Sequence, residues 1–136
     1  MSWRGVALIA AIYGLLAVVL AALGAHLLPA DRPDAHKLWA TALQIHMFHA
    51  AAMLAIAALA GSRSSALIPW SGLLMAVGVL LFSGSLYLRA AGIELLPGQL
   101  TPLGGIIAML SWVMLIFTLA MNTTNKNRCS DEPPEL

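Results

Sequence analysis

Neutral polar side chains that could bind a ligand occur here within stretches that are otherwise apolar. They are histidine, glutamine, serine, tyrosine and threonine residues: His26, Gln44, His46, His49, Ser83, Ser85, Tyr87 and Thr101. A neutral imidazole can ligate haem or a metal ion, or hydrogen-bond the head group of a quinone. No aspartate or glutamate lies among these residues. Their types therefore favour ligand binding over acid–base catalysis.

Helical spacing divides these residues into separate faces. His46, His49 and Met53 are spaced i, i+3, i+7 and share one helix face. Gln44 points about 140–200° away from both histidines, at about 100° per residue. A metal ion needs a third or fourth ligand, for which His26 is the plausible partner and loop residue His36 is more remote. We therefore predict no metal site, with His26, His46 and His49 as the candidate ligands if one exists.

Ser83 and Tyr87 are spaced i, i+4 on one helix face, and Ser85 points elsewhere. In a chain that crosses the membrane repeatedly, all eight polar residues fall toward the same membrane face. Two interpretations of this half remain open. It could bind a ligand, or its polar groups could form hydrogen bonds between helices, each worth about 1 kcal/mol or less.

The elements that position these residues are predicted from the charges. The 136-residue chain is 60% AVILMFWYC and 10% Asp, Glu, Lys and Arg, against about 25% charged residues in soluble domains. Four windows contain no charge: residues 5–30, 38–62, 64–88 and 95–125. Each exceeds the roughly 20 residues that cross about 30 Å of hydrocarbon. We therefore predict an all-α integral membrane protein with four antiparallel transmembrane helices in a compact bundle.

Local signals set the predicted boundaries. Pro29 ends the first helix, Asp34 caps the second with Trp39 at the headgroup level, and Thr101 caps the fourth. The polar tail is predicted to be disordered. The predicted transmembrane domain covers residues 1–121, with spans at about 6–28, 38–60, 67–88 and 102–121, and the tail covers 122–136.

Small residues recur four positions apart, a spacing that lets membrane helices approach closely. The pairs and triplet are Ala10/Gly14, Ala17/Ala21/Ala25, Ala51/Ala55, Gly72/Ala76 and Gly104/Ala108.

Composition also excludes several functions. A net charge of +1 provides no basic surface for nucleic acid, and a single cysteine, Cys129, forms no intramolecular disulfide. No phosphate-binding glycine loop, paired-carboxylate site or metalloprotease helix occurs, which excludes soluble catalytic folds. The N-terminal side has four basic residues and the other side three, so the positive-inside rule favours cytoplasmic termini by one charge.

Four motifs in order resemble a known family. They are Gly24-Ala25-His26, Trp39-Ala-Thr-Ala-Leu-Gln44 leading to Met47-Phe48-His49-Ala50, Phe82-Ser-Gly-Ser-Leu-Tyr87 and Thr101-Pro-Leu-Gly-Gly105. Over roughly residues 5–120 the chain resembles the YgdD-like family of small bacterial inner-membrane proteins. This family is the domain of unknown function 423, related to animal transmembrane protein 256.

The resemblance implies a four-helix inner-membrane protein and no established activity. The positions that carry the family pattern are His26, Gln44, His49, Ser83, Gly84, Ser85, Tyr87, Thr101 and Gly105. His46 departs from it, because relatives usually have another polar residue there. This departure counts against a two-histidine metal site and favours a hydrogen-bonded cluster built on His49 and His26, near Tyr87, the two serines and Thr101.

The leading hypothesis is a non-enzymatic component of the bacterial inner membrane, with cytoplasmic termini and no cofactor. It binds membrane lipid, a membrane-protein partner or a second copy through the polar cluster. One alternative is a redox component in which His26 and His49 bind haem or a quinone. The other is a small-solute transporter, which is not expected to be proton-coupled because no span contains an embedded carboxylate.

Overall fold

The computed structural model describes residues 2–63, 65–93 and 97–130, with side chains described as far as residue 121. Within these ranges the chain forms helices and no strands. They are α1 (Trp3–Leu27), α2 (Pro33–Ser62), α3 (Leu67–Ala90) and α4 (Leu100–Ser130). Each is long and apolar enough to cross a membrane. This confirms the predicted all-α class and the four candidate spans.

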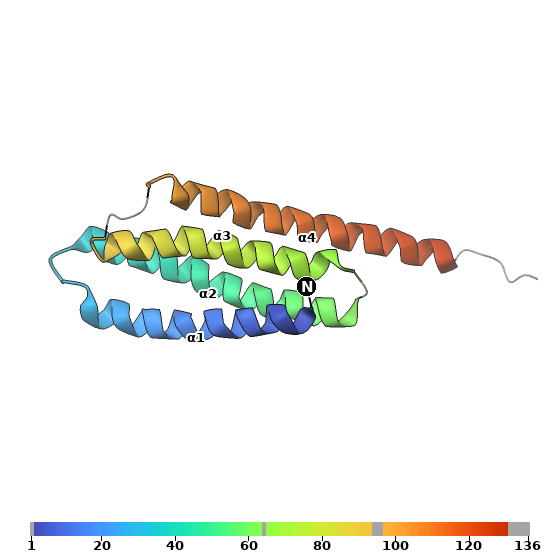
Figure 1. The fold of residues 1–136 in the computed structure, drawn as a ribbon, viewed down its shortest axis with the longest axis horizontal. Helices are drawn as coiled ribbons and strands as arrows, with labels where there is room; N and C mark the ends of the chain where they lie inside the picture. The colour runs from blue at the N-terminus through green and yellow to red at the C-terminus, as the bar shows by residue number, and fades with distance from the viewer. Residues whose placement is uncertain (1, 64, 94–96, 131–136) are drawn as a thin grey trace, which may run out of the picture.

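The helices run antiparallel and pack in chain order (Figure 1). α2 packs on α1 and on α3, and α4 packs on α3. α1 and α3 meet only over a short stretch, and no close backbone contact joins α4 to α1 or α2 in the described part of the chain. The bundle is therefore open, with α1 and α4 on opposite sides of the central pair.

The start of α2 differs from the prediction. Pro33 occupies its first turn, because the fixed φ of proline suits a helix start. The N-cap is Arg32, whose side chain makes no capping hydrogen bond. Asp34 lies within the first turn, so the predicted Asp34 cap is wrong and the helix begins five residues before residue 38.

A turn at Gly92 ends α3 and lies next to the loop between α1 and α2. Gly92 has φ +81°, and the Ile93 amide donates to the Leu88 carbonyl at 2.9 Å. This is the Schellman arrangement, in which glycine satisfies the last carbonyls of a helix. A Cβ at Gly92 would lie 3.4 Å from the Arg32 guanidinium. The first and third loops therefore lie at the same end of the bundle, as alternating spans require.

α4 is longer than its predicted span at both ends. It begins at Leu100, so Thr101 lies inside the helix and the predicted Thr101 cap is wrong. It continues past Met121 to Ser130, because no glycine or proline interrupts residues 106–132. The end of the predicted disordered tail, residues 131–136, lies outside the described residues.

Two glycines of the predicted small-residue pairs allow close helix contacts. A Cβ at Gly72 would lie 2.6 Å from Val6 Cγ1, where α1 meets α3. A Cβ at Gly104 would overlap the backbone nitrogen of Phe82 and lie 2.8 Å from the Gly78 carbonyl oxygen. These contacts confirm the predicted roles of Gly72 and Gly104. The other small residues divide: Ala10, Ala17, Ala76 and Ala108 are buried, whereas Gly14 has no neighbour within 4 Å of a Cβ and Ala25, Ala51 and Ala55 are exposed.

Gly104→Ala is expected to lower the free energy of unfolding by about 1–3 kcal/mol, because the new methyl group meets backbone atoms that cannot rotate away. Gly14→Ala is the matched control. It should leave stability unchanged or raise it by up to about 1 kcal/mol, because the same substitution there meets open space and improves helix propensity. Reversible unfolding in mixed micelles measures both, and equal effects would contradict this account of the α3–α4 contact.

Candidate functional site

Six side-chain hydrogen bonds join different helices within the described residues. All lie in the middle of the bundle or toward the end that carries the first and third loops. They link Tyr13 to Ala76, Trp39 to Leu20, Ser83 to Ala42, Ser85 to Thr101, Tyr87 to His46 and Trp112 to His49. Toward the opposite end, buried Ser71 and Thr118 bond only within their own helices, as does Ser111 beside Trp112. The polar asymmetry predicted from the sequence is therefore built mainly from interhelical contacts.

His49 is buried with both ring nitrogens engaged. Nδ1 lies 2.8 Å from the Ile45 carbonyl oxygen, which can only accept, so Nδ1 carries the proton and donates. Nε2 then accepts the Trp112 Nε1–H at 3.3 Å. This bond links α2 to α4, whose backbones do not otherwise meet. The ring is neutral and has no lone pair free for a metal ion.

His46 differs sharply from His49, although both are buried. Its Nδ1 lies 3.4 Å from the Tyr87 hydroxyl, a long contact. Its Nε2 has no hydrogen-bond partner, the only such buried side-chain nitrogen or oxygen in the part of the chain that the structure describes. The Tyr13 backbone carbonyl interacts electrostatically with the ring but lacks the geometry of a hydrogen bond. His46 therefore retains unused hydrogen-bonding capacity inside the bundle.

The predicted serine and threonine hydroxyls form hydrogen bonds within and between helices. The buried Ser83 hydroxyl donates to the Ala42 carbonyl at 2.9 Å and joins α3 to α2. The Ser85 hydroxyl lies 2.9 Å from the Phe82 carbonyl and 2.6 Å from Thr101 Oγ1. Ser85 donates to that carbonyl, so it accepts from Thr101. Thr101 thus links α4 to α3.

Trp39 connects three helices, and its predicted position at the headgroup level stays a prediction. Its Nε1 donates to the Leu20 carbonyl at 2.9 Å, and its ring contacts Tyr87 edge-on at 4.7 Å between centroids. Any Cβ at Gly24 would overlap the indole. Glycine at position 24 therefore leaves the space that the Trp39 indole occupies between the helices.

The predicted cluster of His26 with His49 is not formed. His26 and Gln44 are both exposed, whereas His49 is buried. Leu20 lies level with Trp39, so His26 is six residues beyond that level and His49 ten residues on the other side. At about 1.5 Å per residue, the two histidines are roughly 24 Å apart along the bundle. His26 and His49 of one chain therefore cannot both ligate one haem iron. No group of three His, Cys, Asp or Glu suited to a metal occurs among the described residues.

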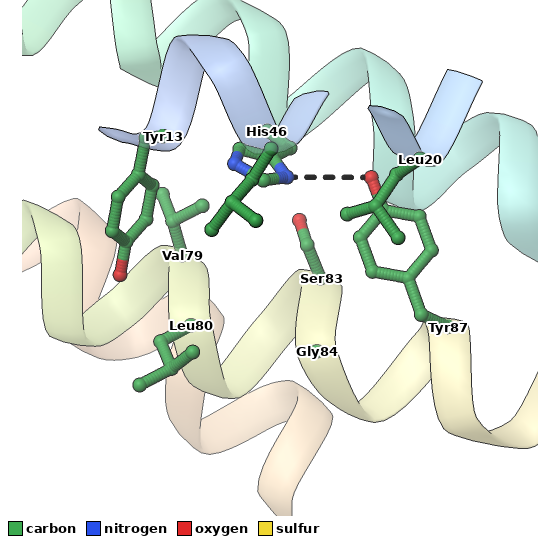
Figure 2. Close-up of a pocket in the computed structure, with 9 residues that line it drawn as sticks. Tyr13, Leu20, His46, Val79, Leu80, Ser83, Gly84 and Tyr87 are labelled. Atoms are coloured by element: carbon green, nitrogen blue, oxygen red, sulfur yellow. Dashed lines mark hydrogen bonds between the residues drawn. The ribbon is translucent and has the colours of Figure 1, made fainter. Parts of the chain in front are cut away.

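A cavity of about 190 Å³ opens where α1 and α3 separate beyond Val6 and Gly72. Figure 2 shows the His46 ring on α2 between Tyr13 and Tyr87, with Ser83 nearby. The residues that line this cavity, here called the α1–α3 cavity, are uncharged: Tyr13, Leu16, Leu20, His46, Val79, Leu80, Ser83, Gly84 and Tyr87. A second cavity, of about 230 Å³, includes His49 and Trp112 between α2, α3 and α4.

Sequence reasoning did not select Tyr13 or Trp112. The Tyr13 hydroxyl donates to the Ala76 carbonyl at 2.8 Å, and its ring meets His46 edge-on at 5.2 Å. Both residues are aromatic side chains with a polar atom inside a charge-free window. Their polar atoms could have indicated hydrogen bonds inside the bundle, because a buried Tyr O–H or Trp N–H usually has a hydrogen-bond partner.

These features define a small integral membrane protein with an internal polar network and an uncharged lateral cavity. The chain belongs to the family described as "Protein of unknown function (DUF423)", which it matches over residues 20–105.

Similar proteins support the assignment. The UPF0382 membrane protein YwdK of Bacillus subtilis is 40% identical over 111 residues, covering 80% of this chain and 90% of its own. The UPF0382 inner membrane protein YgdD of Escherichia coli K12 is 35% identical over 117 residues, covering 85% and 89%. The UPF0382 membrane protein SAB0533 of Staphylococcus aureus is 34% identical over 110 residues, covering 80% and 89%. No solved structure matches the fold.

His49→Ala is expected to lower the free energy of unfolding by about 1 kcal/mol or more beyond the effect of His46→Ala. The first change leaves the Trp112 N–H without its acceptor, whereas the second breaks one long contact. Unfolding of both variants in mixed micelles measures the difference. Equal losses, or a larger loss from His46→Ala, would contradict the assigned roles.

Proposed function

We propose that this protein is a non-enzymatic component of the bacterial inner membrane that binds a lipid molecule in the α1–α3 cavity. One observation carries the proposal: a buried histidine with an unpartnered ring nitrogen lines a cavity between membrane-spanning helices. A polar group left unpaired in hydrocarbon is costly, so a ligand that pairs with it gains binding energy.

The position of the cavity supports a ligand that arrives from the bilayer. His46 lies within two residues of the midpoint of α2, and Tyr13 within two residues of the midpoint of α1. Two lining residues, Leu16 and Leu80, are 44% and 62% exposed and form a lateral mouth. A molecule dissolved among the acyl chains can therefore enter sideways.

The alternative functions receive less support. Haem bound by His26 and His49 requires two residues that lie far apart in one chain. Proton-coupled transport normally uses an embedded carboxylate, and none lines either of these cavities. A membrane-protein partner or a second copy remains a prediction. The exposed apolar faces of α1 and α4 suit protein contact and lipid contact equally.

Gly84→Leu is expected to reduce lipid retention in native mass spectrometry from mild detergent several-fold, because Gly84 lines the cavity and has no neighbour within 4 Å of a Cβ. The added side chain fills the cavity without a backbone clash. Gly14→Leu is the matched control, since it also meets open space but lies outside this cavity. Retained lipid that is equal in wild type, Gly84→Leu and Gly14→Leu would refute the proposed site.

Both termini are proposed to be cytoplasmic, from the excess of one basic residue on their side. A green fluorescent protein fused to the C-terminus should fluoresce, because it matures in the cytoplasm. Alkaline phosphatase fused there should be inactive, because it folds only on the other side of the membrane. The opposite pair of results would reverse the orientation. Either orientation leaves the cavity and its lining residues unchanged.

A further inference from the structure

We infer that the ligand of the α1–α3 cavity is a quinone or quinol, a neutral ring carrying oxygens, held by His46 Nε2. This inference rests on the proposed lipid-binding function and specifies its ligand class. It concerns binding of the ring and involves no electron transfer.

The ligand must be neutral. None of the residues that line the cavity carries a charge, and the surrounding hydrocarbon makes an unpaired ion expensive. The depth excludes the ester groups of phospholipids. Those groups border a hydrocarbon layer about 30 Å thick, whereas His46 lies eight residues, or about 12 Å, inside the start of the predicted span at residue 38. The oxygen that pairs with His46 therefore belongs to a molecule that is itself soluble in hydrocarbon.

The hydrogen-bonding chemistry selects an oxygen that can accept or donate. If the Tyr87 hydroxyl donates to His46 Nδ1, then Nε2 carries the proton and needs an acceptor such as a quinone carbonyl. If Nδ1 donates to Tyr87, then Nε2 is a lone pair and needs a donor such as a quinol hydroxyl. A quinone–quinol pair complements both tautomers. The hydroxyl protons of Ser83 and Tyr13 already bond to carbonyls, which leaves Nε2 as the unpaired group.

Size and shape favour a ring. An apolar cavity of about 150 Å³ holds benzene, so about 190 Å³ has room for a substituted six-membered ring. The Tyr13 and Tyr87 rings lie 5.2 and 6.1 Å from the His46 ring and provide aromatic walls. The hydrocarbon tail of the ligand leaves between Leu16 and Leu80. Nε2 is covered by its neighbours, so side chains at the cavity must shift before the ring can reach it.

Trp39 provides a built-in probe, because its indole contacts Tyr87 at the cavity wall and quinones quench indole fluorescence. The test uses the full chain in phospholipid nanodiscs. Exposed Trp3 and Trp70 are changed to phenylalanine to reduce background, and decylubiquinone is the titrant. We expect saturable quenching, and a dissociation constant at least tenfold higher in His46→Leu. His26→Leu is the matched control and should bind as wild type, because His26 is exposed and distant.

Two further measurements keep the result interpretable. Without ligand, His46→Leu should unfold at the same or higher denaturant than wild type, because the change removes an unpaired buried nitrogen. In Gly84→Leu, the quenching of tryptophan fluorescence should rise only linearly with quinone concentration, as it does for quinone dissolved in the lipid. Saturable quenching that His46→Leu does not weaken would overturn the role of His46. If Gly84→Leu releases lipid but no saturable quenching occurs, the quinone inference fails and the lipid-binding proposal stands. If Gly84→Leu changes neither, both fail.

Discussion

Hydrocarbon supplies no hydrogen bonds, and the polar side chains of this bundle are arranged accordingly. Nearly every buried hydroxyl or ring nitrogen in the described part of the chain is paired, often with a carbonyl of its own or a neighbouring helix. These bonds align the helices where close glycine contacts do not. His49 Nε2 and Trp112 connect α2 to α4, which lack backbone contact. The one unpaired group, His46 Nε2, stands out against this pattern.

The open packing order follows from where close approach is possible. Gly72 allows α1 to touch α3 near Val6, and Gly104 brings α4 against α3. Beyond the Val6 contact, the aromatic side chains of Tyr13 and Trp39 occupy the space between helices and donate to carbonyls of α3 and α1. Small residues thus close one end of the α1–α3 boundary, and larger aromatic residues hold the rest apart. The α1–α3 cavity is a direct result of that change in side-chain size.

The four spans could be predicted because charge is excluded from hydrocarbon, and the polar half could be predicted because antiparallel helices alternate in direction. Which polar residues meet could not be predicted, because it depends on helix rotation. Gln44 and His26 face outward, whereas His46, at which this chain departs from the family pattern, lines the cavity. The contact of Trp39 with Gly24 could not be predicted either, because it is set by packing between helices. Asp34 and Thr101 were predicted to be N-caps. Both lie inside the first turn, because their helices already begin at Pro33 and Leu100.

The central claim is that two neighbouring histidines differ in whether their ring nitrogens are engaged. Nitrogen-15 NMR of selectively labelled histidine in nanodiscs tests this directly, with His46→Leu and His49→Ala used to assign the signals. We predict that His49 is a fixed Nδ1–H tautomer whose shifts do not respond to added decylubiquinone, and that the Nε2 shift of His46 changes on the same addition. A His46 signal that stays constant while His49 responds would contradict the account.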